Sequence, residues 1–170
     1  MPDTPQVLVA GVGNIFLGDD GFGSQVARTL ATRPLPDGVR VTDYGIGGIH
    51  LAYDLLAGVD LLVLVDALPR GAAPGTVTLL EVEADEDLPR GTVDSHAMDP
   101  ATVFASLRGL GGHVPPTVVV GCEPADVSER MGLSPRVEAA VEPTVTQILA
   151  LLDDPAGTLE RAPARVTEEG

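Results

Sequence analysis

The 170-residue sequence contains no lysine, no tryptophan, a single cysteine and only 3% aromatic residues. Without lysine there is no Walker-type phosphate lysine, no Schiff-base nucleophile and no Ser/Lys catalytic pair. The one cysteine, Cys122, cannot form an internal disulfide framework. A core with so few aromatic side chains must be built from Val, Leu, Ala and Ile, which favours β-branched strands under aliphatic helices.

Long hydrophobic runs and positive charge are also scarce. No segment approaches the roughly 20 uninterrupted apolar residues of a membrane helix, and the opening MPDTPQVLVA lacks the features of a secretory signal. The chain carries 25 acidic residues against 10 arginines, so its net charge is −15. This balance argues against nucleic acid and anionic membranes as partners. We therefore expect a cytoplasmic protein that neither inserts into a membrane nor binds nucleic acid.

The order of apolar segments predicts alternating strands and helices within one domain, residues 1–152. The expected strands are 7–11, 39–43, 60–66, 76–83 and 116–122, and the expected helices are 21–33, 49–57, 100–110 and 134–152. This alternation implies parallel strands joined by helical crossovers, but the loop before strand 76–83 is too short for one, so that strand is expected to be antiparallel. The predicted fold class is three-layer α/β, with a five-stranded, mostly parallel twisted sheet, one antiparallel strand and helices on both faces.

Local signals describe the end of the chain. Ser134 suits a helix N-cap and Pro135 the first helical position. Pro143 should kink the last helix or divide it. Residues 153–170 are rich in Pro, Ala, Glu and Arg, which predicts a disordered tail.

Polar residues are predicted to gather at one edge of the sheet. Asp19 and Asp20 follow the first strand, and Asp66 ends the third. His96 precedes a crossover helix that begins at the same edge. Because functional groups in open parallel sheets collect beyond the carboxyl ends of the strands, this edge is the candidate site.

A glycine-rich turn after a strand raises two possible ligands, a nucleotide and a metal ion. A dinucleotide fingerprint needs G-x-G-x-x-G, but the third position is Phe16, and Asp19 and Asp20 would repel a pyrophosphate. Asp43 could still mimic the acid that binds a ribose. The alternative is a metal held by carboxylates and an imidazole, with positions left open for a substrate atom or water. A plainer interpretation is that Asp19 and Asp20 only cap the first helix and favour its positive end, and that Asp66 only begins a turn.

Three further residues carry side chains that could take part in chemistry: His50, His113 and Cys122. His50 begins the second helix at the same edge and could join the site, but an exposed histidine at a helix start is commoner. His113 precedes the fifth strand and so belongs to the opposite edge. Cys122 could form a Cys/His nucleophile with His96, although a free cysteine is more often a small buried hydrophobe. No G-x-S-x-G motif is present to support a serine hydrolase.

Five blocks occur in a telling order: GVGNIFLGDDGFG (11–23), DYGIGG (43–48), LLVLVDAL (61–68) with the following APGT, SHAMDPATVFASL (95–107) and GLSPRVEAAV (132–141). Together they resemble the hydrogenase maturation proteases over about residues 6–152. The resemblance implies a compact α/β fold and an endopeptidase that removes the C-terminal extension of a nickel-iron hydrogenase large-subunit precursor after nickel insertion. Ile46 departs from the threonine that related proteases often carry in the glycine loop.

The resemblance also implies a ligand set. It places metal contacts on Asp20, Asp66 and His96, with nickel supplied by the substrate and no organic cofactor. Asp20 and Asp66 are then the candidate catalytic residues, and Asp20 or Asp19 could act as general base toward a water molecule. A non-catalytic, nickel-dependent checkpoint or chaperone for hydrogenase assembly is the alternative, because the same ligands serve both functions.

Overall fold

The computed structural model describes residues 4–83, 100–155, 157 and 166–169. The strands are β1 Val7–Val12, β2 Val39–Gly45, β3 Leu61–Ala67, β4 Val77–Val82, β5 Thr117–Cys122 and β6 Val166–Glu169. The helices are the 3-10 helix η1 Gly18–Gly21 and the α-helices α1 Phe22–Leu30, α2 Gly48–Leu56, α3 Pro100–Gly109 and α4 Pro135–Leu152. None of the described helices is long and apolar enough to cross a membrane.

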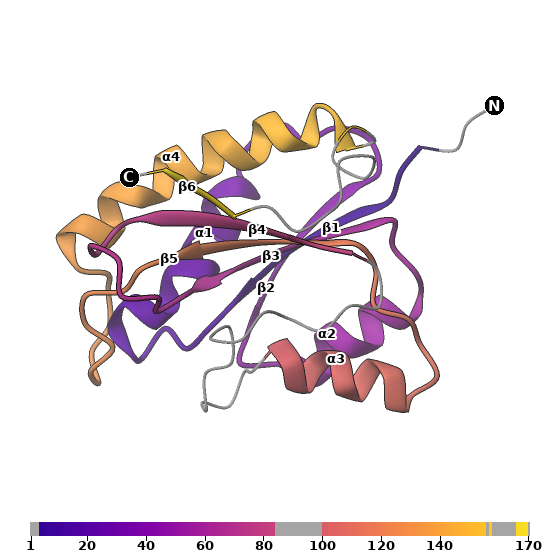
Figure 1. The fold of residues 1–170 in the computed structure, drawn as a ribbon, viewed down its shortest axis with the longest axis horizontal. Helices are drawn as coiled ribbons and strands as arrows, with labels where there is room; N and C mark the ends of the chain where they lie inside the picture. Colours follow the sequence, from indigo (N-terminus) through magenta and orange to yellow (C-terminus); the bar gives the residue numbers. More distant parts are fainter. Residues whose placement is uncertain (1–3, 84–99, 156, 158–165, 170) are drawn as a thin grey trace.

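The sheet has the strand order β2-β1-β3-β5-β4-β6 (Figure 1). β1 pairs in parallel with β2 and β3, and β3 pairs in parallel with β5. β4 runs antiparallel to β5, which confirms the orientation predicted from the short loop before it. All five predicted strands are present in the predicted α/β fold, so the carboxyl ends of β1, β2, β3 and β5 meet at one edge, called here the carboxyl edge.

A sixth strand extends the sheet beyond β4. β6 pairs antiparallel with β4, with Leu80 opposite Val166 and Val77 opposite Glu169. These four residues belong to the tail for which the sequence predicts disorder, and in them the structure differs from that expectation. The physical reason lies in β4, whose outer edge would otherwise present a row of unpaired backbone groups to the solvent.

Helices cover both faces of the sheet and bury two cores. α1 and α4 lie on one face, and α2 and α3 lie on the other (Figure 1). Successive side chains of β1 point to opposite faces, so Val7 and Val9 join the core under α1 and α4, while Leu8 and Ala10 join the core over α2 and α3. β1 is therefore apolar at every position because it is buried on both sides.

Glycines let α1 lie directly against the sheet. A Cβ on Gly11 would overlap the carbonyl oxygen of Gly23 and come within 2.6 Å of the Cβ of Ala27. A Cβ on Gly23 would overlap the carbonyl oxygens of Val12 and Val65. The close approach fixes the start of α1, and with it the preceding loop, against the ends of β1 and β3.

The last helix tests two details of the sequence prediction. α4 is not divided at Pro143 and continues as one element from Pro135 to Leu152. Val141 and Val145 on either side of Pro143 are buried in the same core, so packing outweighs the lost hydrogen bond. Ser134 does occupy the N-cap position, but its side chain makes no capping hydrogen bond; its hydroxyl donates elsewhere, as described below.

We expect Gly23→Ala to lower the free energy of unfolding by about 1–3 kcal/mol, because the new methyl group overlaps backbone that cannot move aside. Urea unfolding followed by circular dichroism measures the effect. The matched control is Gly109→Ala, also at a helical glycine but with open space around the added Cβ. Alanine is favoured over glycine in helices, so the control should be neutral or up to about 1 kcal/mol more stable. A Gly23→Ala protein as stable as the control would contradict the close approach.

Candidate functional site

Two of the predicted site residues meet at the carboxyl edge. Asp20 lies in η1, the element that follows β1, and Asp66 is the penultimate residue of β3. β1 and β3 are parallel neighbours, with Gly11 opposite Val65, so the loop that carries Asp20 and the end of β3 that carries Asp66 lie at the same edge. Both residues are half-buried. Their side chains are therefore held in place by their surroundings and can still be reached from solution.

Gly13 separates the two acids. Its φ of 131° is one that a residue with a side chain rarely adopts. A Cβ at this position would overlap the carbonyl oxygen of Asp20 and lie 3.6 Å from Oδ1 of Asp66. Gly13 is therefore required by the shape of the loop, and its missing side chain lets the two acidic segments approach each other.

Backbone amides orient both carboxylates. The Asn14 amide donates to Oδ2 of Asp20 over 2.8 Å, and the Ala67 amide donates to Oδ1 of Asp66 over 2.8 Å. Two carboxylates on adjacent strand ends offer oxygen ligands to a cation, and either could accept a proton. The predicted third member, His96, lies outside the described residues, and within them no group of three or more His, Cys, Asp or Glu side chains could hold a metal ion.

Asp19 has a different role from its neighbour. Its side chain is fully buried and accepts four hydrogen bonds. The amides of Ala125 and Asp126 donate to Oδ2 over 2.8 and 3.0 Å, the Ser134 amide donates to Oδ1 over 2.7 Å, and the Ser134 hydroxyl donates to Oδ2 over 2.8 Å. Asp19 thus ties the loop after β1 to the loop between β5 and α4.

The same bonds decide the charge of Asp19. Burial alone would raise its pKa, but the hydrogen bonds from Ser134, Asp126 and Ala125 outweigh burial and hold the pKa below its ordinary value. A carboxylate whose two oxygens already accept four hydrogen bonds has little capacity left to take a proton from water. The structure therefore removes Asp19 from the candidates for general base and leaves Asp20. Neither acid caps α1, whose N-cap is Gly21 and has no side-chain capping bond.

Glu123 is a second buried acid at this edge, and the sequence analysis did not single it out. Its carboxylate accepts hydrogen bonds from the amides of Arg70 and Gly71 over 2.6 and 3.1 Å. These amides belong to the loop that follows Asp66. Because Glu123 comes directly after β5, the only sequence signal was its position at a strand end, which it shares with Asp66.

Asp43, His50 and His113 lie in surroundings typical of residues with a structural role. Asp43 accepts hydrogen bonds from the Ser24 hydroxyl over 2.7 Å and from Arg28 Nε over 3.1 Å, so its carboxylate links β2 to α1. His50 is exposed on the first turn of α2, as expected for a histidine at a helix start. His113 is exposed and precedes β5, which places it at the opposite edge of the sheet, as predicted.

Cys122 is buried at the end of β5. Burial, and then the negative charges of Asp19 and Glu123, raise the pKa of its thiol to about 12. A thiol with this pKa carries almost no thiolate at neutral pH, which argues against a nucleophilic role and supports the reading as a small buried hydrophobe.

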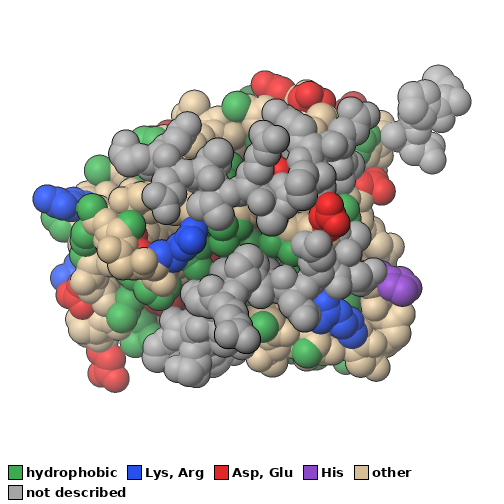
Figure 2. Space-filling model, in the orientation of Figure 1, with side chains coloured by type: hydrophobic (Ala, Val, Ile, Leu, Met, Phe, Trp, Pro, Cys, Tyr) green, Lys and Arg blue, Asp and Glu red, His purple; other side chains and the backbone are tan. Residues whose placement is uncertain are grey.

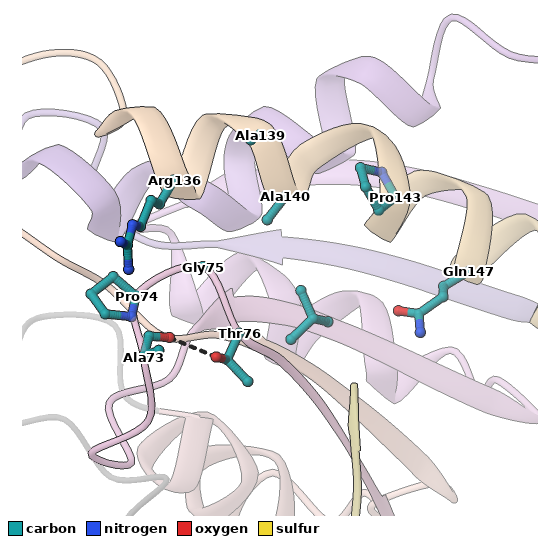
Figure 3. Close-up of a pocket in the computed structure, with 10 residues that line it drawn as sticks. Ala73, Pro74, Gly75, Thr76, Arg136, Ala139, Ala140, Pro143 and Gln147 are labelled. Atoms are coloured by element: carbon teal, nitrogen blue, oxygen red, sulfur yellow. Dashed lines mark hydrogen bonds between the residues drawn. The ribbon is translucent and has the colours of Figure 1, made fainter. Parts of the chain in front are cut away.

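A cavity of about 560 Å³ lies between α4 and the start of β4 (Figure 3). Ala140 and Pro143 of α4 form one wall, Pro74 and Thr76 form the other, and the Thr76 hydroxyl donates to the Ala73 carbonyl over 2.6 Å. None of the described residues that line it is acidic or a histidine, so they add no metal ligand or proton acceptor to the candidate site.

Comparison with known proteins assigns the geometry to a family. A family model described as hydrogenase maturation protease matches residues 24–151. The hydrogenase 2 maturation protease of Escherichia coli is 36% identical over 149 residues, covering 86% of this chain and 90% of the relative. A putative hydrogenase maturation protease of Methanocaldococcus jannaschii is 33% identical over 150 residues, covering 84% and 94%.

Solved structures agree with the sequence relatives. A hydrogenase maturating endopeptidase from Escherichia coli superposes with a TM-score of 0.76 at 32% identity, covering 96% of this chain and 98% of that chain. A hydrogenase 2 maturation peptidase from a Thaumarchaeota archaeon gives a TM-score of 0.67 at 33% identity, covering 87% and 98%. Sequence and fold therefore point to the same group of proteins.

Replacing Asp19 by Asn should lower the free energy of unfolding at pH 7 by about 2–4 kcal/mol, because an amide nitrogen would face amide donors in a buried site. The pKa of Asp19 is lowered by folding, so its contribution is present above the unfolded value of about 3.9 and is lost as the pH falls through the folded value. Urea unfolding from pH 7 down to pH 3 should show this loss in the wild type and a flatter profile in Asp19→Asn.

The control for Asp19 is Asp126→Asn. The pKa of Asp126 is also lowered, by hydrogen bonds from Ser128, but its side chain is exposed. A much smaller loss of stability is expected there. Equal losses in the two variants would show that burial of Asp19 does not matter.

Cys122 should resist alkylation in the folded protein. Iodoacetamide at pH 8 should leave the native chain unmodified by intact mass and should add one group after unfolding in urea, because the thiol is buried and its pKa is about 12. Rapid modification of the native chain, at the rate of a free thiol, would contradict both the burial and the raised pKa.

Proposed function

The chain belongs to the hydrogenase maturation protease family, and we propose that it removes the C-terminal extension of a nickel-iron hydrogenase large-subunit precursor once nickel has been inserted. Membership of this family makes the chain a peptide hydrolase, an endopeptidase of hydrogenase maturation. The proposal adds the order of events, the nickel-bearing substrate and the residues that recognise it. It places the reaction in the cytoplasm.

The observation that carries the proposal is the approach of Asp20 and Asp66 around Gly13. Two half-buried acids held at one edge of the sheet give that edge negative charge, which favours a cation. We propose that this cation is presented by another protein. Asp20, Asp66 and His96 would supply two carboxylate oxygens and one imidazole, a ligand set suited to nickel among other transition metals.

In this proposal the nickel is part of the substrate. Two carboxylates and one imidazole, with no thiolate, should bind a free transition metal ion weakly, so stable engagement requires further ligands from the precursor. The chain would then respond to a loaded precursor and stay disengaged from an empty one.

The chain's own residues can support hydrolysis in a limited way. Asp20 reaches the carboxyl edge from η1 and is the acid able to accept a proton from an attacking water, since Asp19 is committed to Ala125, Asp126 and Ser134. Asp66, held by the Ala67 amide, would contact the metal side of the substrate. Peptide hydrolysis then needs a water molecule and a polarised carbonyl in reach of Asp20.

The test compares precursor processing by the wild type and by Asp20→Asn, Asp66→Asn and His96→Gln. Intact mass should show loss of a C-terminal peptide only from the nickel-loaded precursor, and each substitution should slow this loss by about 100-fold or more. The matched control is Asp60→Asn, an acid just before β3 whose carboxylate accepts the Gln6 amide at the opposite edge. Its rate should equal that of the wild type.

Two outcomes would count against the proposal. Wild-type rates in both Asp20→Asn and Asp66→Asn would remove the carboxyl-edge site. Tight binding of the loaded precursor without any cleavage by the wild type would instead favour a checkpoint or chaperone that uses the same ligands.

A further inference from the structure

Large hydrophobic side chains are exposed around the carboxyl edge. Met131 is 67% exposed, Phe16 61% and Ile46 56%, and Ile49 and Val127 are exposed as well. We call these five residues the apolar rim. Two exposed leucines, Leu56 and Leu110, lie elsewhere, at the C-terminal ends of α2 and α3.

The strand order places the rim at the same edge of the sheet as the acids. Phe16 follows β1, Ile46 follows β2 and Ile49 lies in the first turn of α2, whereas Val127 and Met131 follow β5. β3, which carries Asp66, lies between β1 and β5 in the sheet. The rim residues therefore share the carboxyl edge with the candidate site.

Hydrogen bonds hold part of the rim in shape. The Arg130 amide donates to the Phe16 carbonyl over 3.0 Å, and the Gly18 amide donates to the Arg130 carbonyl over 2.8 Å. The Phe16 amide donates to Oδ1 of Asn14 over 2.9 Å, and Asn14 also orients Asp20. Phe16 and Met131 are thus presented by tied loops, so a partner would bind without paying much of the entropy of ordering them.

Exposed apolar side chains grouped around a polar centre mark contact surfaces on soluble proteins. In Figure 2 hydrophobic side chains are visible at the left end of the molecule, where β3 and β5 end in Figure 1, with acidic and basic side chains beside them. Leaving several large apolar groups in water on a chain of net charge −15 contributes nothing to solubility.

We propose that the apolar rim is the docking surface for the precursor, and that the matching surface of the precursor is apolar around a bound cation. This inference rests on the proposed function, which supplies the partner. Charge selects this occupant. A second copy of the chain, docked rim to rim, would bring two chains of net charge −15 together, with four acids at the contact, whereas a cation-bearing partner is complementary in charge to Asp20 and Asp66.

The rim and the acids should then affect different steps. Truncating rim side chains removes contacts made equally by the bound substrate and the transition state, which raises KM and leaves kcat nearly unchanged. The acids act at the reacting group and should mainly lower kcat. This split separates a docking surface from a part of the catalytic site.

The experiment uses the full chain and the nickel-loaded precursor. The double variant Phe16→Ser/Met131→Ser should raise KM about 10-fold or more, with kcat within about twofold of the wild type. The control Leu56→Ser/Leu110→Ser removes the same kind of exposed side chain away from the rim and should leave both constants unchanged. Circular dichroism checks that both variants fold.

A binding arm separates failure of docking from failure of the proposed function. Asp66→Asn, with and without the rim substitutions, is titrated against the loaded precursor, and the rim substitutions should weaken Kd about 10-fold. Equal KM and Kd for the rim and control variants overturn the docking surface while cleavage stands. If the wild type binds the loaded precursor without cleaving it, the endopeptidase function is overturned, while the Kd values still test the rim. If the rim substitutions abolish self-association in sedimentation and leave Kd for the precursor unchanged, the rim binds a second copy of the chain instead.

Discussion

The carboxylate of Asp19 is the contact on which the carboxyl edge depends. It is buried, charged and bonded to four donors that come from the loop between β5 and α4. A buried carboxylate tolerates its loss of water only when such bonds replace it, so the loop after β1 and the loop after β5 are held in one relative position. That position also fixes Asp20, the next residue in the chain, and the neighbouring rim side chains Phe16 and Met131.

The paired acids show how one short motif divides its tasks. Asp19 points into the protein and holds two loops, while Asp20 remains half-buried at the edge, where its carboxylate accepts a hydrogen bond from the Asn14 amide. Gly13 and Gly23 make both placements possible, because side chains there would collide with the Asp20 carbonyl and with the ends of β1 and β3. The glycine-rich turn thus brings backbone close enough to the sheet to present an acid where nucleotide-binding folds present amides to a phosphate.

The sequence predicts the fold well because its signals are local and repeated. Val7–Val12 and Leu61–Ala67 are continuous apolar runs, and the short connection to Val77–Val82 requires an antiparallel strand. Details that depend on distant contacts could not be predicted. The sequence does not tell which of the neighbouring residues Asp19 and Asp20 is buried, because the groups that donate hydrogen bonds to Asp19 lie more than 100 residues away. The same holds for the Ser134 hydroxyl, and for the exposed state of Phe16 and Met131.

If the proposed function holds, the rim and the acids together would give a physical basis for discrimination between loaded and empty precursors. Docking of an apolar surface on the rim would exclude water from Asp20 and Asp66. Without a cation, the loss of hydration from two carboxylates would carry a cost that offsets the gain from apolar contact. With nickel in the partner, the same burial strengthens the attraction between cation and carboxylates, because the surrounding dielectric falls. Discrimination would then arise from the desolvation of two acids and needs no conformational switch in the chain.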